Sequence, residues 1–461
     1  MKFASLPISQ LIQTPFVCDC GRTHLADIRQ VCIGKGVTSR IEEFLAAQPT
    51  KGRMLEQAMD ELLVVCDPNT REVFGDTLAQ RLTQEGWKVR MHCFAQSQPH
   101  ATMALAQELM EDITPATGLL LAVGSGTVND LSRYASYQKA LPYYIIATAP
   151  SMDGFASTVS PLVVDDLKQT FEAHCADCII GDTDLLATCP DRMLAAGLGD
   201  VLGKVWSVHD WEMSHQLLGE YYCPEIAALM NQAVDRCKQA VPGLQKRDSK
   251  ALEQLMEALV LAGIAMAFAG NSRPASSGEH HIAHCLEMQS IFGGEYGELH
   301  GINVGLGTLV MGSLYRNFLA CTPDKDKAMA HAKAFDWKDY QTRMEALYQK
   351  GAPAVLELEQ KEQRHAPEAT IQRIEAYFAH EEEINQGIAQ ALEQLSGSAQ
   401  LMQSLDGYID FAPYPHSKEM WKAILRDAKE IRSRYTGLQL MDDLGLLEEL
   451  VEKTVEEFWR G

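Results

Sequence analysis

The stretch Leu119-Leu-Leu-Ala-Val-Gly-Ser-Gly-Thr-Val-Asn-Asp130 decides the fold of this chain. Its apolar first half predicts a buried strand, and Gly124-Ser-Gly126 predicts a tight turn into a helix. A strand, a glycine turn and a helix N-terminus form a cradle for phosphate, because unpaired N–H groups and the helix dipole face the anion. The spacing G-x-G-x-x-x-D differs from the Rossmann G-x-G-x-x-G pattern, so the turn alone is weak evidence for a nucleotide site.

Short β-rich runs alternate with helical patterns on both sides of this stretch. The strands are expected at 61–66, 88–94, 118–123 and 142–147, with helices at about 70–86, 102–112 and up to 138. Continuous apolar strands separated by helices are typical of βαβ units and of a parallel sheet that is covered on both faces. We therefore predict an α/β, Rossmann-like nucleotide-binding domain over residues 1–190.

Helical periodicity dominates after Pro190. Apolar residues recur at intervals of three and four over 253–268, 304–315 and 438–458, which predicts an all-helical domain over 191–461. The segment from about 324 to 403 is rich in Glu, Gln, Lys and Ala and has few bulky residues. We expect a solvated helical insertion there, with a partner-binding arm as the alternative.

The charge of the chain excludes some classes of partner. It has 461 residues, and 40 Lys and Arg minus 62 Asp and Glu give a net charge of −22, which argues against nucleic acid or an anionic membrane as the main partner.

The longest apolar run, Ala258–Gly270, has 13 residues and is too short to span a bilayer. The N-terminus has no apolar core of signal-peptide length, so we expect a cytoplasmic protein. A homo-oligomer is expected, with a dimer as the simplest case.

Twelve cysteines are too few for a disulfide scaffold in a chain of this length. Two local pairs, Cys18–Cys20 with His24 nearby and Cys175–Cys178, suggest zinc. However, Cys-x-Cys is an uncommon spacing for structural zinc, and no second pair follows at the usual interval. We interpret these residues as reduced, partly buried thiols near strands, and whether they bind anything stays open.

Two further strand ends support a dinucleotide. Asp67 follows the strand that ends at Cys66, where a carboxylate can accept both ribose hydroxyls and would repel a 2′-phosphate. Small polar residues, Thr148-Ala-Pro-Ser151, follow the strand at 142–147. Ligands of open α/β sheets bind outside the carboxyl ends of the strands. The three ends together predict NAD or NADP, with NAD modestly favoured.

The helical half contains a possible metal site. His280 and His284 are four residues apart and share a helix face, and Ser276-x-x-Glu279 is a capping-box pattern that starts this helix. With Asp200 and His300 they offer a carboxylate and imidazoles, which suit a divalent metal with positions left open for substrate oxygens. The remaining histidines of this region are interpreted as surface or core residues: His209, His215 and His281.

Taken together, these segments resemble the superfamily of iron-containing alcohol dehydrogenases and dehydroquinate synthases, and within it the sn-glycerol-1-phosphate dehydrogenases. The resemblance runs from about Phe16 to the C-terminus and fades over 324–403. It is carried by the following stretches: Val123–Asp130, Thr148–Ser157, Gly199-Asp200, Ser272–His280 with His284, His300-Gly301 and Ile431–Thr436.

The resemblance implies a dehydroquinate synthase-like fold and specific site residues. It implies NAD(P) contacts at Gly124, Gly126, Thr127, Asn129, Asp130, Thr148, Ser151 and Ser157. It implies metal ligands at Asp200, His280 and His300, and substrate contacts at Asp153 and His284, with Asp200 sharing that role. The sequence departs from the family pattern at Ser125, where many members have a glycine, and at Lys204, where the iron-type enzymes have a histidine. The second departure favours a three-ligand, polyol-type site.

The activity expected from this resemblance is reversible hydride transfer between NAD(P)H and dihydroxyacetone phosphate, giving sn-glycerol 1-phosphate. Arg273 and the backbone donors near Ser276 are the candidate phosphate holders. The metal is expected to be zinc, with nickel, iron or manganese as alternatives. Three other functions stay open: a dehydrogenase of glycerol or another unphosphorylated polyol, a dehydroquinate-synthase-like lyase, and a non-catalytic nucleotide-binding protein.

Overall fold

The structure is a computed structural model, and it describes residues 2–46, 61–165 and 167–459. The chain folds into two compact units. The first comprises residues 1–201 and 231–271, and the second comprises 202–230 and 272–461. Two long helices, α8 (Asp191–Leu218) and α9 (Pro224–Leu244), continue from one unit into the other.

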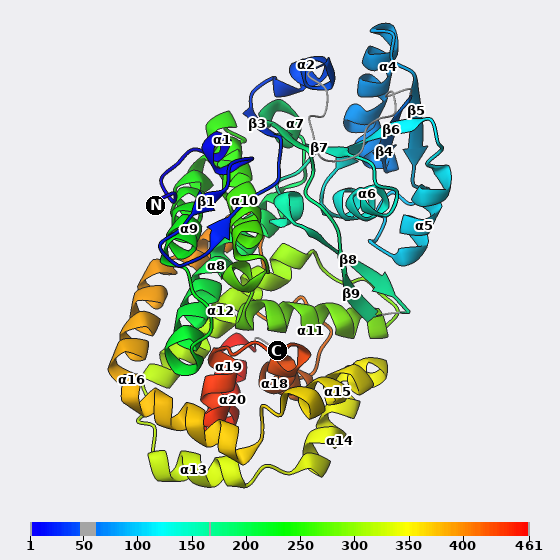
Figure 1. Ribbon diagram of the computed structural model, residues 1–461. Coiled ribbons are helices and arrows are strands. Elements are labelled where there is room, and N and C mark those ends of the chain that lie inside the picture. Colours follow the sequence, from blue (N-terminus) through cyan, green and yellow to red (C-terminus); the bar gives the residue numbers. More distant parts are fainter. Residues whose placement is uncertain (1, 47–60, 166, 460–461) are drawn as a thin grey trace. The chain divides into compact units, whose positions relative to one another are not determined.

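The first unit is built on a six-stranded parallel sheet with the order β3-β10-β7-β6-β4-β5 (Figure 1). β4, β6 and β7 are buried along their whole length, since covered strands of a parallel sheet are apolar on both faces. This confirms the predicted α/β fold. The strand bounds are β3 Gln30–Gly34, β4 Glu61–Cys66, β5 Val89–Cys93, β6 Thr117–Gly124, β7 Tyr143–Ala147 and β10 Cys178–Asp182.

Helices connect these strands. Leu78 and Leu82 of α4 pack into the same apolar core as Val64 and Leu121 of the sheet. β5 follows β4 in the chain and pairs with one side of it as an edge strand of the sheet. β6 then pairs with the other side of β4, so the strand order reverses between β4 and β6. The connecting elements are α3 Pro68–Thr70, a π-helix η2 Arg71–Gly75, α4 Asp76–Gln84, α5 Met103–Asp112 and α6 Gly126–Gln138.

Other elements of this unit are short, except for α10 (Ser249–Ala269). A Cβ built on Gly263 would lie 2.7 Å from Cβ of Ala156, so α10 approaches the backbone of η3 (Gly154–Ala156) closely. α10 is long and apolar enough to cross a membrane, but 72% of its most apolar window is buried, as in a core helix. The others are α1 Ile8–Leu11, β1 Phe16–Val17, β2 Thr23–His24, η1 Val37–Arg40, α2 Ile41–Ala46, β8 Val159–Val164, β9 Leu167–Glu172 and α7 Thr183–Leu186.

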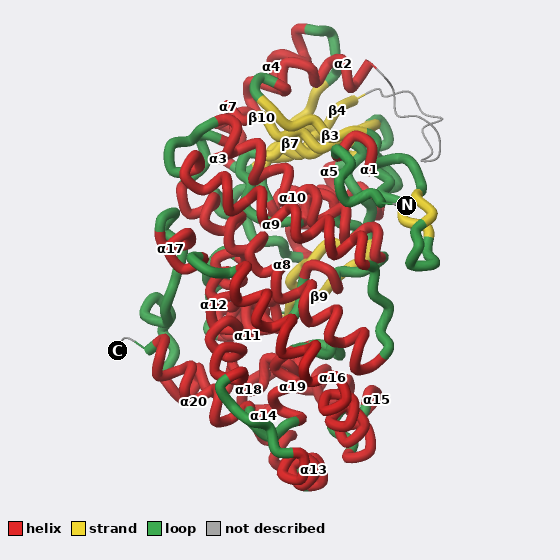
Figure 2. Tube along the Cα trace, turned by 90° about the vertical axis from the view of Figure 1, so that its left-hand side faces the viewer, coloured by secondary structure: helices red, strands yellow, loops and turns green. Residues whose placement is uncertain are grey.

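The described part of the second unit contains helices and loops. Figure 2 shows its helices in red and the strands of the first unit in yellow. The last strand, β10, ends at Asp182, before the expected division at residue 190, and residues 231–271 lie in the first unit, where α10 packs on β3 and η3. The helices are η4 Arg273–Ala275, α11 Gly278–Phe292, α12 His300–Leu319, α18 Lys418–Asp427, η6 Ala428–Ile431, α19 Gly437–Asp443 and α20 Leu447–Phe458.

Residues 324–403 are helical and expose many side chains, and buried polar contacts also tie them to the rest of the second unit. Buried Glu430 accepts hydrogen bonds from Arg364 at 2.8 Å and Tyr340 at 3.2 Å, and lies 3.0 Å from Nε2 of His365. Arg373 pairs with buried Asp443 at 2.7 Å. We call these residues the Glu430 network, and it ties the segment to η6 and α19. The helices are α13 Lys325–Lys333, α14 Trp337–Tyr348, η5 Gln349–Gly351, α15 Ala352–Glu362, α16 Pro367–Gln394 and α17 Ser398–Gln403.

Candidate active site

Three neighbouring strands of the sheet carry the predicted cofactor residues at their carboxyl ends. β7, β6 and β4 are adjacent, and Thr148, Gly124 and Asp67 lie at or directly after their ends. The strand order reverses between β6 and β4, which is the point where open α/β sheets bind nucleotides. The sheet therefore brings together the groups that the sequence placed on separate strands.

The turn between β6 and α6 requires glycine for close packing. A Cβ built on Gly124 would lie 2.5 Å from Cβ of Val128, so the helix approaches the strand without room for a side chain. Ser125 stands at the N-cap, and its hydroxyl lies 2.5 Å from that of Ser151. The N–H groups of Gly126 and Thr127 belong to the first turn of α6, where an anion is favoured.

Three other predicted cofactor residues hold the turn in place. Asn129 is buried, and its Nδ2 donates to the carbonyl of Gly154 at 3.3 Å. Asp130 accepts from the buried Arg133 at 2.7 Å. The hydroxyl of Ser157 donates to the carbonyl of Val159 at 3.1 Å. These hydrogen bonds hold the loops at the carboxyl edge of the sheet, where the cofactor is predicted to bind. A direct contact of these side chains with the cofactor stays a prediction.

Asp67 is the N-cap of α3. Its Oδ1 accepts from the backbone N–H of Thr70 at 2.9 Å, and the hydroxyl of Thr70 accepts from the N–H of Asp67 at 3.0 Å, which is a reciprocal capping box. Burial raises the pKa of Asp67, while hydrogen bonds from Thr70 and Asn69 oppose that shift. The carboxylate is thus held at the edge of the sheet by the same helix that it caps.

Asp153 and Asp200 meet within the first unit. Asp200 is fully buried in α8, and its Oδ2 accepts from the backbone N–H of Asp153 at 2.9 Å. Gly197 lies one turn earlier on the same helix, and a Cβ there would collide with the carbonyl of Pro150. α8 therefore packs directly against the loop that follows β7, which fixes the Asp200 carboxylate beside Asp153.

Three predicted histidines gather in the second unit. The ring centroids of His280 and His300 are 5.3 Å apart, those of His284 and His300 are 5.3 Å apart, and those of His280 and His284 are 6.1 Å apart. His280 and His284 lie on α11, whereas His300 begins α12, which packs on α11. The two helices therefore form one imidazole cluster.

Each imidazole of the cluster is oriented by a carboxylate. Nδ1 of His280 lies 2.7 Å from Glu279. Glu287 serves two rings, with Oε1 2.6 Å from Nδ1 of His300 and Oε2 3.1 Å from Nδ1 of His284. A carboxylate accepts the proton on Nδ1, so Nε2 carries the lone pair, which is the usual arrangement of metal-binding histidines. Glu287 is not among the residues predicted from the sequence, although its position three residues after His284 on one helix indicates that the two side chains can meet.

Arg273, the predicted phosphate holder, is occupied by the protein itself. Its guanidinium donates to Glu220 at 3.1 Å and to the carbonyls of Asp210 and Tyr435 at 2.8 Å. Only 3% of the residue is exposed. These contacts join three segments of the second unit, so the geometry favours a structural role over phosphate binding.

Arg432 is a better placed cation. Its pKa is lowered by burial, and the nearby carboxylate of Glu287 opposes that shift. Within the described residues its guanidinium forms no hydrogen bond or ion pair. Its neighbour Arg434, in contrast, donates to the carbonyl of Ser276 at 3.0 Å. Arg432 thus offers unengaged donors next to the imidazole cluster.

The remaining residues of the region pack in the core. Burial lowers the pKa of His209 to about 4, and burial together with the charges of Arg432 and Arg434 lowers the pKa of His281 well below its usual range. Buried Lys204 donates to the carbonyl of Ala275 at 3.0 Å. We keep the interpretation that these histidines are packing residues.

Known proteins are similar to this chain in sequence. Residues 32–190 match the family model described as iron-containing alcohol dehydrogenase. A glycerol-1-phosphate dehydrogenase [NAD(P)+] of Bacillus licheniformis is 28% identical over 451 residues, which is 97% of each chain. The same-named protein of Halalkalibacterium halodurans is 35% identical over 306 residues, 65% of this chain and 74% of the relative.

Solved structures give the fold. Glycerol dehydrogenase from Schizosaccharomyces pombe superposes with a TM-score of 0.58 at 16% identity, covering 93% of this chain and 91% of that one. An alcohol dehydrogenase from an archaeal halo-thermophile of a Red Sea brine pool superposes with a TM-score of 0.59 at 13% identity. Together with the sequence relatives, these matches establish that the chain belongs to the glycerol-1-phosphate dehydrogenase family, with the fold of the iron-containing alcohol dehydrogenases.

Proposed function

We propose that this protein catalyses reversible hydride transfer between NAD(P)H and dihydroxyacetone phosphate, giving sn-glycerol 1-phosphate. The imidazole cluster carries the proposal, because three histidines oriented by two carboxylates suit the polarisation of a carbonyl oxygen. The relatives named glycerol-1-phosphate dehydrogenase [NAD(P)+] support this choice of substrate.

The donor set fits a divalent metal, and we propose Asp200, His280 and His300 as its ligands. Asp200, Gly203 and Ser207 lie on one face of α8, at intervals of three and four. In the second unit Ser207 donates to Glu279 at 2.7 Å, and Glu279 holds His280. Glu279, which orients His280, is therefore held by a residue of the same α8 face that carries Asp200. When bound, a divalent ion such as zinc would act as a Lewis acid on the substrate carbonyl.

The protein's own residues would handle the proton and the substrate hydroxyls. His284 is held at Nδ1 by Glu287, so its protonated ring can give the Nε2 proton to the oxygen formed at C2. In the reverse reaction the Nε2 lone pair of the neutral ring can take that proton back. Asp153, fixed beside Asp200, is proposed to orient a substrate hydroxyl. Arg432 is proposed to bind the substrate phosphate in place of Arg273, since its donors are not engaged by the protein.

NAD(P)H, the hydride donor, is proposed to bind at the edge formed by Asp67, Gly124 and Thr148. The phosphates would face the N–H groups of α6, and the ribose hydroxyls would face Asp67. Asp67 favours NAD over NADP because its charge repels a 2′-phosphate.

The test is a nicotinamide absorbance assay of the purified protein with dihydroxyacetone phosphate, glycerol and the two glycerol phosphate enantiomers, each with a panel of divalent metals. We expect NADH oxidation with dihydroxyacetone phosphate, loss of that activity after chelation, and its recovery with one metal. Turnover with glycerol alone would instead identify a polyol dehydrogenase. Phosphate release without net change in NADH would identify a lyase.

A further inference from the structure

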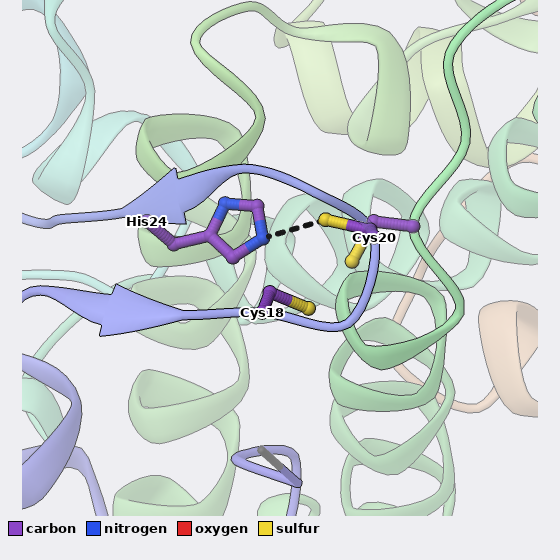
Figure 3. A group of neighbouring side chains, drawn as sticks. Cys18, Cys20 and His24 are labelled. Carbon is purple, nitrogen blue, oxygen red and sulfur yellow. Dashed lines mark hydrogen bonds between the residues drawn. The ribbon is translucent and has the colours of Figure 1, made fainter.

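The N-terminal hairpin carries a second group of metal-type ligands. β1 and β2 pair antiparallel, and the turn between them is Cys18-Asp-Cys-Gly-Arg22. The N–H of Gly21 donates to the carbonyl of Cys18 at 3.1 Å, and Gly21 has a φ of +84°, which glycine adopts readily. This tight turn places Cys18, Cys20 and His24 on one small hairpin, as Figure 3 shows.

The ligand atoms of these three side chains are close enough to share one ion. Sγ of Cys20 lies 3.3 Å from Nε2 of His24, and all three ligand atoms lie within 4.8 Å of one another. Tetrahedral zinc, with Zn–S of about 2.3 Å and Zn–N of about 2.0 Å, separates its ligands by roughly 3.5 Å. The hairpin therefore presents nearly the spacing that zinc requires.

His24 is set in the tautomer that binds a metal. Its Nδ1 lies 2.8 Å from the carbonyl oxygen of Phe268, and a carbonyl can only accept, so Nδ1 carries the proton. Nε2 then carries the lone pair and faces the sulfur of Cys20. A backbone carbonyl that holds the second ring nitrogen is a common support for a metal-ligating histidine.

The surroundings hold the three ligands in place. His24 is buried and stacks on Phe268 of α10 at 5.6 Å between centroids, and Phe3 and Phe16 complete this aromatic group. Cys18 is 5% exposed, whereas Cys20 is half-buried, so an ion can reach the site from its side. Strands of two residues each are too short to be stable alone, so the hairpin would gain from a cross-link.

We propose that Cys18, Cys20 and His24 bind a structural zinc ion that fixes the N-terminal hairpin on the end of α10. Two thiolates and one neutral imidazole neutralise Zn²⁺ and fill three of its four positions. The fourth position is left to water or to a side chain outside the hairpin. This site differs from the imidazole cluster in having sulfur ligands, so each can be tested without the other.

Cobalt substitution distinguishes the two sites. Thiolate ligands give Co²⁺ a sulfur-to-metal charge-transfer band in the near ultraviolet, which an Asp/His/His site does not produce. We expect the full-length protein loaded with Co²⁺ to show this band, and we expect Cys20→Ser and His24→Ala to weaken it severalfold. His280→Ala should keep the band although it removes a ligand of the proposed catalytic metal. Cys321→Ser, a change of a half-buried cysteine at the end of α12, is the matched control and should also keep it.

A measurement on the wild-type protein tests the proposal even if the variants fail to fold. Titration of the thiols with an organomercurial, in the presence of a metallochromic dye, should release about one zinc ion per chain as Cys18 and Cys20 react. The proposal is overturned if the wild-type protein shows no sulfur-to-cobalt band, or if Cys20→Ser keeps both the band and the zinc.

Discussion

Oε1 of Glu287 lies 2.6 Å from Nδ1 of His300, and the other oxygen of this carboxylate orients His284. One side chain therefore controls the tautomers of two imidazoles on different helices. The carboxylate also raises the basicity of both rings, so Glu287 influences a bound metal without being one of its proposed ligands.

Glu287→Gln is expected to weaken metal binding by about 10- to 100-fold, the usual effect of losing a carboxylate behind a ligating histidine. The activity of the variant should return at higher metal concentration, measured by metal titration of the chelated enzyme. Glu295→Gln changes an exposed carboxylate nearby and should bind metal like the wild type. Equal metal affinity in Glu287→Gln and the wild type would contradict this role.

Gly124→Ala should push α6 away from β6, because the added Cβ would meet Val128 at 2.5 Å. Overpacking of this kind costs about 1–3 kcal/mol, and we expect a raised KM for NADH as the phosphate cradle opens. Chemical denaturation and cofactor titration measure the two effects. Gly312→Ala is the control, since its nearest neighbour is 3.8 Å away, and it should leave both quantities near wild type.

Asp67→Asn separates the charge of this residue from its capping role. Asparagine caps helices as well as aspartate does, so the stability of the protein should change little. The repulsion of a 2′-phosphate disappears, and we expect the kcat/KM ratio of NADPH to NADH to rise about tenfold, which corresponds to ~1.4 kcal/mol. An unchanged ratio would place the ribose away from Asp67.

Arg432→Ala should raise the KM for dihydroxyacetone phosphate at least about tenfold, the effect of losing one charge-assisted contact, and leave the KM for NADH unchanged. Arg273→Ala should instead lower the melting temperature, because Glu220 and two buried carbonyls lose their donor. The opposite pattern, with a substrate effect only in Arg273→Ala, would restore the sequence-based assignment.

Asp210 should make stability fall as the pH rises from about 4 to about 6. Burial raises its pKa to about 6, although hydrogen bonds from Ser277 and Tyr315 and the charge of Arg273 oppose that shift. An unfolded aspartate titrates near pH 3.9, so the protonated form is favoured by folding, and its contribution, on the order of 3 kcal/mol, is lost as the pH passes the folded pKa. The free energy of unfolding, measured by urea titration at each pH in this range, should fall less steeply with pH in Asp210→Asn than in the wild type. Parallel plots of this free energy against pH would contradict the assignment.

The strands were predictable from the sequence where a local run of apolar residues marks them. β4, β6 and β7 lie within one residue of their predicted bounds because each is apolar on both faces. β3, which is half-buried, and β10, which is buried, were not predicted. Their burial comes from pairing with each other and with β7, which no local pattern records.

The site was predictable to a similar degree. Spacing on one helix predicts that His280 and His284 share a face, and the structure adds His300 beside them. The engagement of Arg273 could not be foreseen, because its partners Glu220 and Tyr435 are 53 and 162 residues away. Contacts at such separations depend on the packing of whole helices.

The Glu430 network implies a rule for the evolution of this chain. Lys429, Arg364 and His365 hold the pKa of buried Glu430 well below its usual range against the effect of burial, and two of these three cations belong to residues 324–403. A buried carboxylate that loses its partners costs several kcal/mol. A homologue that shortens this segment must therefore exchange Glu430 and Asp443 for uncharged residues at the same time. Among related sequences, we expect these acidic positions and Arg364, His365 and Arg373 to be gained and lost together.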